Sequence, residues 1–274
     1  MILNMATMPK IDFRHTQLEK NSLRSAFGRA AKNYDDWADL QRRVGDNLLC
    51  KVNEYSVSLP TILDLGSGTG YCAKRLSEHC DKLIALDIAH GMLAQQRLGG
   101  IANVTYICGD AESLPLQTAS VDMVFSNLAI QWCQGLENLF AEIKRVLRPG
   151  GQFLFSSFGP QTLCELRDAW AEVDRMSHVN EFIPLSLIHE VMHRSGFIEI
   201  ELKSEKISID YRDVLQLMRE LKGIGAHNVT RRRPRGLTGK KKLDRMMNAY
   251  ARQMPGSSCI ATFELYYGSA YCLV

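Results

Sequence analysis

The chain has 274 residues, 46% of them hydrophobic and 23% charged, which suits one globular domain of generous size. No apolar run approaches the roughly 18 residues that span a bilayer, and residues 1–15 lack the zones of a secretory signal peptide, so we expect a cytoplasmic protein without a membrane span. The net charge of +3 is concentrated in Arg231–Arg245, which carries eight basic residues and one acidic residue, whereas the rest of the chain is acidic.

The first predicted element is an amphipathic helical region over residues 22–50. Apolar residues recur there at helical spacing, as in Leu23, Phe27 and Tyr34. Because this region precedes the first strand, we expect residues 1–50 to form a helical lid over one end of the sheet. Tyr34 is interpreted either as a core aromatic residue or as part of the active-site cover.

A glycine-rich turn follows the first predicted strand. The apolar run of that strand contains Asp64 near its end, and Gly66, Gly68 and Gly70 come next, before a predicted helix over 71–79. Glycines let the backbone turn sharply and come close to a ligand. Such a turn at the carboxyl edge of a parallel sheet is where doubly wound folds bind nucleotide-like ligands.

Two common nucleotide-binding patterns do not fit this turn. Tyr71 and Ala73 stand where the dinucleotide pattern G-x-G-x-x-G needs its third glycine, and no Gly-Lys-Ser/Thr follows as the Walker A loop requires. An NAD-dependent oxidoreductase is therefore disfavoured.

Polar side chains end the next three predicted strands. The strand over 82–87 ends in Asp87, seventeen residues beyond Gly70. A carboxylate at this place can accept both ribose hydroxyls of an adenosine, and the alternative is an ordinary surface aspartate. The strand over 103–110 ends in Asp110, and the fourth strand ends in Asn127.

The remaining elements continue the alternation of helix and strand. A helical stripe over 136–147 stops at Arg148-Pro-Gly-Gly151, because proline and glycine terminate helices. We then expect a strand over 152–158, helices over 161–174 and 185–195, a sixth strand over 197–202 and a last strand over 261–271. The segment 211–255 lies between the last two strands and is interpreted as a helical cap on the sheet's active edge. The predicted division is a lid over 1–50, a core over 51–210, a cap over 211–256 and a last strand over 257–274.

The pattern Asp64-x-Gly66-x-Gly68-x-Gly70 resembles the first motif of the class I S-adenosylmethionine-dependent methyltransferases. The resemblance implies a doubly wound, seven-stranded Rossmann-like α/β sheet with an antiparallel last strand and a helical insertion before it. It also implies S-adenosylmethionine as the cofactor, with the acid of the first motif near the methionine amino group and Gly109-Asp110-Ala111 at the adenine edge. The cofactor-binding residues implied are Asp64, Gly66, Gly68, Gly70, Asp87, Ile88, Met92, Asp110, Ala111 and Asn127.

Four further segments resemble one branch of this family, the malonyl-acyl-carrier-protein O-methyltransferases of biotin synthesis. They are the lid from Phe27 to Gln41, Ser126-Asn-Leu-Ala-Ile-Gln-Trp132, His178-Val-Asn-Glu-Phe182 and Leu221-Lys-Gly-Ile-Gly-Ala226. The resemblance implies methyl transfer to the free carboxylate of a malonyl thioester on acyl carrier protein. The first twenty residues and the density of the basic run depart from the pattern.

The implied chemistry needs few special side chains. A carboxylate is ionised at neutral pH, since its pKa is ~4, so no general base is required. Tyr34 is expected to position the acceptor. The cluster Arg231, Arg232, Arg233 and Arg235 is expected to dock the acidic carrier protein, unless the basic run is only a solvated loop. None of the eight cysteines forms a C-x-x-C pair, and no metal is expected.

Several alternatives stay open at this point. Another small acceptor, such as a quinone precursor or a different carboxylic acid, would suit the same fold. RNA is disfavoured, because the basic run lacks interleaved aromatic residues for base stacking. A non-enzymatic protein on a degenerate fold is disfavoured by the intact acids and glycines. We expect a monomer.

Overall fold

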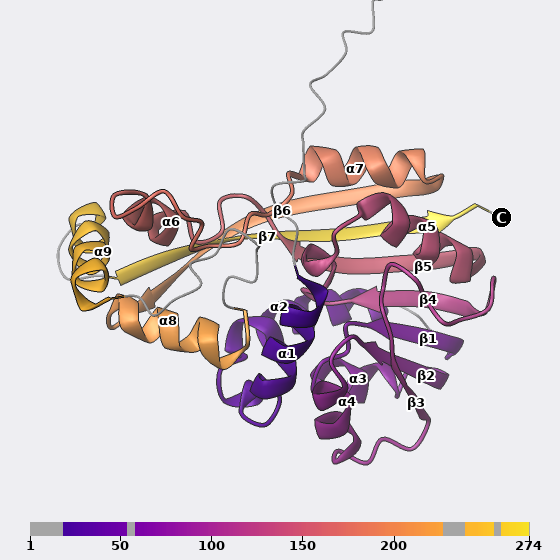
Figure 1. The fold of residues 1–274 in the computed structure, drawn as a ribbon. Helices are drawn as coiled ribbons and strands as arrows, with labels where there is room; N and C mark the ends of the chain where they lie inside the picture. Colours follow the sequence, from indigo (N-terminus) through magenta and orange to yellow (C-terminus); the bar gives the residue numbers. More distant parts are fainter. Residues whose placement is uncertain (1–18, 54–57, 227–238, 255–258, 274) are drawn as a thin grey trace, which may run out of the picture.

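A seven-stranded mixed sheet forms the centre of the molecule in the computed structural model, which describes residues 19–53, 58–226, 239–254 and 259–273. The strands are β1 (Leu59–Leu65), β2 (Cys80–Asp87), β3 (Val104–Cys108), β4 (Val121–Ser126), β5 (Leu147–Phe158), β6 (Phe197–Tyr211) and β7 (Cys259–Cys272). Their order is β3-β2-β1-β4-β5-β7-β6 (Figure 1). The pairs among β1 to β5 are parallel, and β7 lies antiparallel between β5 and β6. The predicted Rossmann-like sheet with an antiparallel last strand is therefore confirmed.

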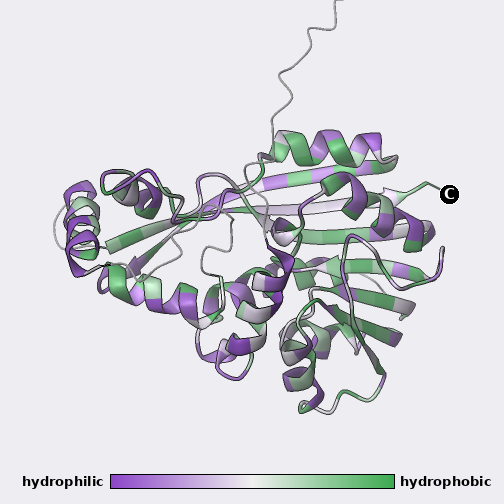
Figure 2. Ribbon diagram, viewed as in Figure 1, coloured by the Kyte–Doolittle hydropathy of each residue, from purple (hydrophilic) through white to green (hydrophobic). Residues whose placement is uncertain are grey.

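Helices pack on both faces of this sheet. They are α1 (Lys20–Ala30), α2 (Asp39–Val52), α3 (Tyr71–Leu76), α4 (His90–Arg97), α5 (Leu136–Val146), α6 (Cys164–Ala171), α7 (Leu185–Arg194), α8 (Val214–Gly223) and α9 (Lys240–Gln253). Leu63 and Leu65 of β1 belong to the buried cluster under α5 and α7, whereas Ile62 belongs to the cluster under α2 and α3. Successive residues of a strand point to opposite faces, so the buried part of β1, from Ile62 to Leu65, is covered on both sides and is apolar except for Asp64. Figure 2 shows this apolar character in the central strands. No helix in the described part of the chain is long and apolar enough to cross a membrane.

Strand β5 begins earlier than predicted. Helix α5 ends at Val146, and β5 starts at the next residue instead of at Gln152. The register against β4 passes from Val121 opposite Leu147 to Met123 opposite Gln152, so the Pro-Gly segment between them is a bulge in the strand. Gly150 has a φ of 76°, which a glycine adopts at little cost.

Strand β6 is longer than predicted and supports the helices that lie beyond the central strands. It continues beyond the predicted end at Leu202 to Tyr211, which pairs with Cys259 of β7. Along β6 the side chains alternate between more and less buried positions, because only one face is well covered. The extended β6–β7 ribbon carries α6, α8 and α9 beyond the ends of the central strands (Figure 1). A second apolar cluster, which includes Trp170, Leu217 and Tyr250, holds these three helices together.

Candidate active site

The three glycines of the turn after β1 have different roles. Their φ angles are 76°, 57° and 96° for Gly66, Gly68 and Gly70, a region that other residues rarely adopt. A Cβ on Gly66 would lie 2.2 Å from the Cβ of Ala129, and one on Gly70 would lie 2.4 Å from Cγ of Gln96. A Cβ on Gly68 would meet nothing within 4 Å. Gly66 and Gly70 are therefore required by packing, and the backbone at Gly68 is open to a ligand.

A cleft with an empty volume of about 790 Å³ lies beside this turn, at the carboxyl ends of β1, β2 and β4; we call it the edge cleft. Its lining contains nine residues predicted from the sequence: Tyr34, Gly66, Gly68, Asp87, Ile88, Met92, Asp110, Ala111 and Asn127. Helix α1 contributes Lys20, Leu23 and Phe27 to the opposite wall. Gly70 does not line the cleft. The structure thus brings together predicted residues that are up to 93 positions apart in the chain, from Tyr34 to Asn127.

Asp87 presents a buried carboxylate to the edge cleft. Its Oδ2 accepts the backbone N–H of Gly68 at 2.9 Å, and its Oδ1 accepts that of Ala89 at 2.7 Å. Burial raises the pKa of Asp87 to about 6, although these backbone donors oppose the rise. The hydrogen bonds fix the orientation of the carboxylate and leave lone pairs on both oxygens for a diol.

Asp64 is a second buried carboxyl group near the glycine turn. Its side chain is 2% exposed, and its Oδ2 has no hydrogen-bond partner among the described residues. Burial raises the pKa of Asp64 to about 7, and the Ser67 side chain opposes this while Asp87 adds to it. The carboxyl lines a small polar recess, which also includes Tyr34, Arg42 and the Gly66–Gly68 backbone. A buried carboxylate oxygen without a partner is costly, so the recess suits a ligand that brings a cationic donor.

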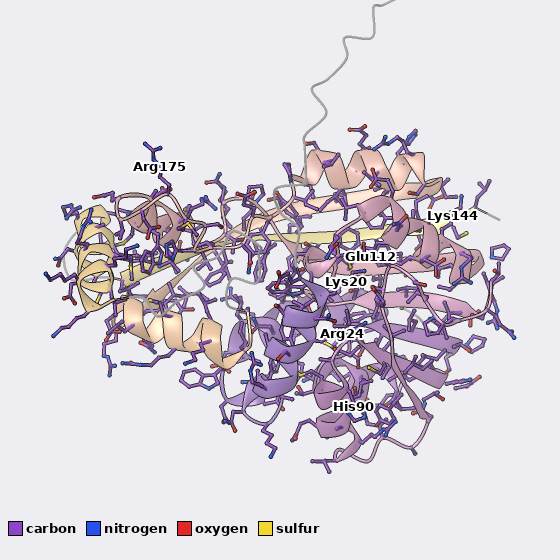
Figure 3. All side chains as sticks on the ribbon, in the orientation of Figure 1. Lys20, Arg24, His90, Glu112, Lys144 and Arg175 are labelled. Atoms are coloured by element: carbon purple, nitrogen blue, oxygen red, sulfur yellow. The ribbon has the colours of Figure 1, made fainter. Side chains whose placement is uncertain are left out.

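Asp110 is shared with a lysine of the lid. Lys20 Nζ lies 2.6 Å from Oδ2 of Asp110 and 2.5 Å from Oε2 of Glu112; Figure 3 shows Lys20 and Glu112 close together between α1 and the sheet. Glu112 Oε1 accepts the backbone N–H of Gly135 at 2.6 Å. Burial raises the pKa of Asp110, but the Lys20 ammonium and the Glu112 backbone N–H outweigh it, and the net pKa is lowered. Sequence reasoning missed Lys20, because nothing local to it indicates a partner 90 residues away.

A second cavity, the cap cavity, adjoins the edge cleft. Its empty volume is about 1140 Å³, and the two share the walls Phe27, Tyr34, Leu128 and Trp132. The rings of Phe27 and Trp132 meet edge to face at 5.4 Å. Most of the remaining lining is apolar and comes from α6, α8 and the segment around Phe182. Among the described residues of this lining, Lys222 is the only lysine or arginine.

Tyr34 lies where the edge cleft, the polar recess and the cap cavity meet, since it lines all three. Burial, with Asp87 nearby, raises the pKa of its phenol, so the hydroxyl stays neutral and can donate a hydrogen bond. Gln41 lines both the recess and the cap cavity, and its buried Oε1 has no partner among the described residues. Gln41 was predicted only as the end of the lid segment, and its open hydrogen-bonding position is visible only in the fold.

His178 joins the cap cavity to α9. Its ring stacks on Trp170 at 3.8 Å between centroids, and its Nε2 lies 2.8 Å from Oδ1 of Asp174. The other oxygen of Asp174 accepts Lys242 Nζ at 2.8 Å. Burial opposes ionisation, but Lys242 and His178 lower the pKa of Asp174 to about 2. One lysine of the basic run therefore has an internal partner that orients a cavity residue.

The predicted docking cluster falls outside the part of the chain that the structure describes. Arg231, Arg232, Arg233 and Arg235 lie outside the described residues. The later part of the basic run forms the start of α9, at the outer end of the extended ribbon (Figure 1). Lys240 and Lys241 are exposed there.

Known proteins resemble this chain in sequence and in fold. Residues 63–155 match a methyltransferase domain family. A malonyl-acyl-carrier-protein O-methyltransferase of Nitrosospira multiformis is 42% identical, over 93% of this chain and 89% of that protein. The protein of the same name from Methylococcus capsulatus is 43% identical, over 90% of this chain and 92% of that protein.

A solved structure shares the fold. The YcgJ protein of Bacillus subtilis superposes with a TM-score of 0.62 at 17% identity, covering 84% of this chain and 99% of that chain. At this identity the likeness extends to the fold alone.

Proposed function

The chain belongs to the family of malonyl-acyl-carrier-protein O-methyltransferases, and from this membership we propose the reaction that it catalyses. It transfers the methyl group of S-adenosylmethionine to the free carboxylate of a malonyl thioester on acyl carrier protein, an early step of biotin synthesis. The observation that carries this proposal is the buried Oδ2 of Asp64, which has no partner in the described part of the chain. It lies in a recess that shares Tyr34 and Gln41 with a largely apolar acceptor cavity.

The edge cleft and the recess fit S-adenosylmethionine. When bound, the cofactor supplies an electrophilic methyl group on a positively charged sulfur. Asp64 Oδ2 would accept a hydrogen bond from the ammonium of the methionine end, a partner that the described residues do not supply to this buried atom. The two oxygens of Asp87 would accept the ribose hydroxyls. Asp110 would accept the adenine amine on the oxygen that Lys20 does not hold, beside Ala111.

The chain's part in the methyl transfer is to hold and orient the acceptor and to exclude water. The acceptor carboxylate is already ionised at neutral pH, so the site does not have to remove a proton. Alignment of a carboxylate oxygen with the methyl group, in a site from which Phe27, Trp132 and Leu128 keep water away, lowers the barrier. Tyr34, which lines the cleft, the recess and the cap cavity, would donate a hydrogen bond from its hydroxyl to the carboxylate oxygen that does not react. Hydrogen-bond donors on the reacting oxygen would weaken its nucleophilicity. A single neutral donor on the other oxygen orients the carboxylate and avoids this effect.

The cap cavity recognises the malonyl thioester through few polar groups. Its apolar walls suit the thioester and the pantetheine arm. Lys222 is the cation that meets the malonyl carboxylate as it enters, since the described lining contains no other lysine or arginine. Gln41 lines both the cap cavity and the recess, and its amide can present either its oxygen or its nitrogen to the acceptor.

The basic run is proposed to attract the carrier protein. Acyl carrier protein is acidic, and a cationic surface raises the association rate of an acidic partner. Lys240 and Lys241 of α9, with Arg231, Arg232, Arg233 and Arg235 outside the described residues, would supply this surface. The eight free cysteines accord with a reducing, cytoplasmic setting for the reaction.

The experiment that tests the proposal offers labelled S-adenosylmethionine to the enzyme with malonyl-acyl carrier protein, malonyl-CoA or bulk tRNA. We expect label on the malonyl thioesters, and more on the carrier-bound substrate than on the CoA ester. Label on tRNA would refute the substrate assignment. Absence of label on every acceptor, from protein that binds S-adenosylhomocysteine, would refute it too and would favour another small acceptor.

A further inference from the structure

The segment Leu221–Ala226 contains two glycines that no part of the proposed chemistry uses. Leu221, Lys222, Ile224 and Ala226 line the cap cavity. Gly223 and Gly225 do not. Both glycines instead lie against residues 19–38, the first described part of the lid. The contact is at the point where the C-terminal end of α8 approaches α1 (Figure 1).

Gly225 has a local explanation. It follows α8 with a φ of 75°, its N–H bonds to Lys222 O at 3.1 Å, and the N–H of Ala226 bonds to Leu221 O at 2.9 Å. This is the usual left-handed termination of a helix, which favours glycine. A Cβ on Gly225 would also lie 3.1 Å from the carbonyl oxygen of Ala26, so the turn is seated on α1.

Gly223 has no such explanation from the backbone. It is the last residue of α8, and its φ lies outside the left-handed region. Glycine in a helix is less favourable than alanine, so helix formation alone would select against it. A Cβ at this position would lie 2.5 Å from both Cγ and Cδ1 of Trp37. The indole of Trp37 therefore packs directly on the backbone of Gly223, and a side chain there would displace either the indole, which is 36% exposed, or α8.

We propose that Trp37, Gly223 and Gly225 form a joint that transmits cofactor binding to the acceptor cavity, so that the cap (described residues 211–226 and 239–254) is held in place by the lid. The inference rests on the edge cleft being the cofactor site of the proposed function. Phe27 and Tyr34 of the lid line both the edge cleft and the cap cavity, whereas no residue of α8 lines the edge cleft. A cofactor that fixes the lid thereby fixes the surface on which α8 rests.

This arrangement predicts positive coupling between the two ligands. Cofactor binding orders the lid, the joint seats α8, and α8 places Leu221, Lys222 and Ile224 in the wall of the cap cavity. The acceptor thioester should bind at least about fivefold more tightly when S-adenosylhomocysteine is present, and the reverse effect should have the same size. Trp37, Gly223 and Gly225 are positioning residues in this scheme, because they act through the cavity wall.

The first test is a double-mutant cycle on Trp37 and Gly223. Gly223→Ala should raise the KM for the malonyl thioester roughly 5- to 150-fold, the scale of an overpacked contact, with S-adenosylhomocysteine affinity changed less than about twofold. In a Trp37→Ala background the added methyl group meets no ring, so Gly223→Ala should raise the KM for the malonyl thioester less than about twofold. An equal increase in KM on Gly223→Ala in the wild-type and the Trp37→Ala background would overturn the proposed role of the Trp37–Gly223 contact. Gly28→Ala is the matched control on α1, since its Cβ would meet nothing within 4 Å.

The second test does not depend on the identity of the acceptor. Hydrogen–deuterium exchange is measured with and without S-adenosylhomocysteine. In the wild type, the ligand should slow exchange in α8 as well as in α1 and α4. In Gly223→Ala, protection of α1 and α4 should remain and protection of α8 should be lost. Ligand protection of α1 without protection of α8 in the wild type would overturn the proposal, even if the malonyl substrate proved correct. If malonyl thioesters were not substrates, this measurement would still decide the joint.

Discussion

Replacement of Asp64 by Asn tests the assignment of the polar recess most sharply. The change keeps the size of the side chain and removes its charge, at a residue that is 2% exposed and whose Oδ2 has no partner among the described residues. If this oxygen accepts the ammonium of the cofactor, the variant loses a charge-assisted hydrogen bond. Such bonds contribute about 1.5–3 kcal/mol, so affinity for S-adenosylhomocysteine should fall roughly 10- to 150-fold at about pH 8.

The pH dependence of the affinity for S-adenosylhomocysteine tests the role of Asp64 independently. Burial raises the pKa of Asp64 to about 7, so the carboxyl of the free protein becomes neutral as the pH falls below that value. The ammonium of the ligand requires the ionised form, and affinity must therefore fall with falling pH. Between about pH 8 and pH 6 the ionised fraction drops roughly tenfold, and Asp87, with a pKa of about 6, adds at most about a factor of two.

Isothermal titration calorimetry of S-adenosylhomocysteine at these two pH values is the assay. The wild type should bind roughly ten- to twentyfold more weakly at the lower pH, whereas Asp64→Asn should change only about twofold. Asp122→Asn on β4 is the control, because Asp122 is paired with Arg148 and Thr61 away from the recess. An Asp64→Asn variant with the pH dependence of the wild type would refute the reasoning.

Three further substitutions probe other parts of the site. Tyr34→Phe should lower kcat roughly tenfold and leave S-adenosylhomocysteine affinity within about twofold, because only the donor to the acceptor is lost; a change confined to cofactor affinity in steady-state and binding assays would contradict this. Lys222→Met should raise the KM for malonyl thioesters roughly tenfold at nearly constant kcat, with Lys222→Arg largely restoring it; unchanged kinetics in both would remove Lys222 from acceptor recognition. Lys20→Met should speed dissociation of S-adenosylhomocysteine about two- to fivefold in stopped-flow measurements, because Lys20 loses the contacts to Asp110 and Glu112 that hold α1 over the cleft. The expected effect is modest because these contacts are partly exposed. A slower dissociation would argue against this role of Lys20.

The cofactor half of the site was predictable because its signals are local in the sequence. Gly66 and Gly68 are near neighbours, Asp87 ends β2, and Asp110 follows two residues after β3, which ends at Cys108 and not at the predicted Asp110. Parallel strands bring their carboxyl ends to one edge, so these residues had to converge. The exception is Gly70, which faces Gln96 and not the cleft, a difference that spacing alone does not reveal.

The cap half was less predictable because it depends on contacts between distant segments. The polar run in β6 resembles a loop until β7 is seen to pair with it, and this pairing is what extends the ribbon that carries α6, α8 and α9. Trp37 and Gly223 are 186 positions apart, and each is unremarkable in its own neighbourhood. The contact of Lys20 with Asp110 spans 90 positions. Resemblance identified Leu221–Ala226 as characteristic, and only the packing shows why two of its residues are glycines.

The central claim is that the methyl group is placed on the free carboxylate of a carrier-bound malonyl group. Mass spectrometry of the pantetheine arm, after reaction of the enzyme with malonyl-acyl carrier protein and S-adenosylmethionine, tests it directly. We expect the malonyl fragment to gain one methyl group, which mild base releases as methanol, and acetyl-acyl carrier protein, which has no free carboxylate, to gain none. A base-stable methyl group, or equal methylation of the acetyl carrier, would contradict the claim.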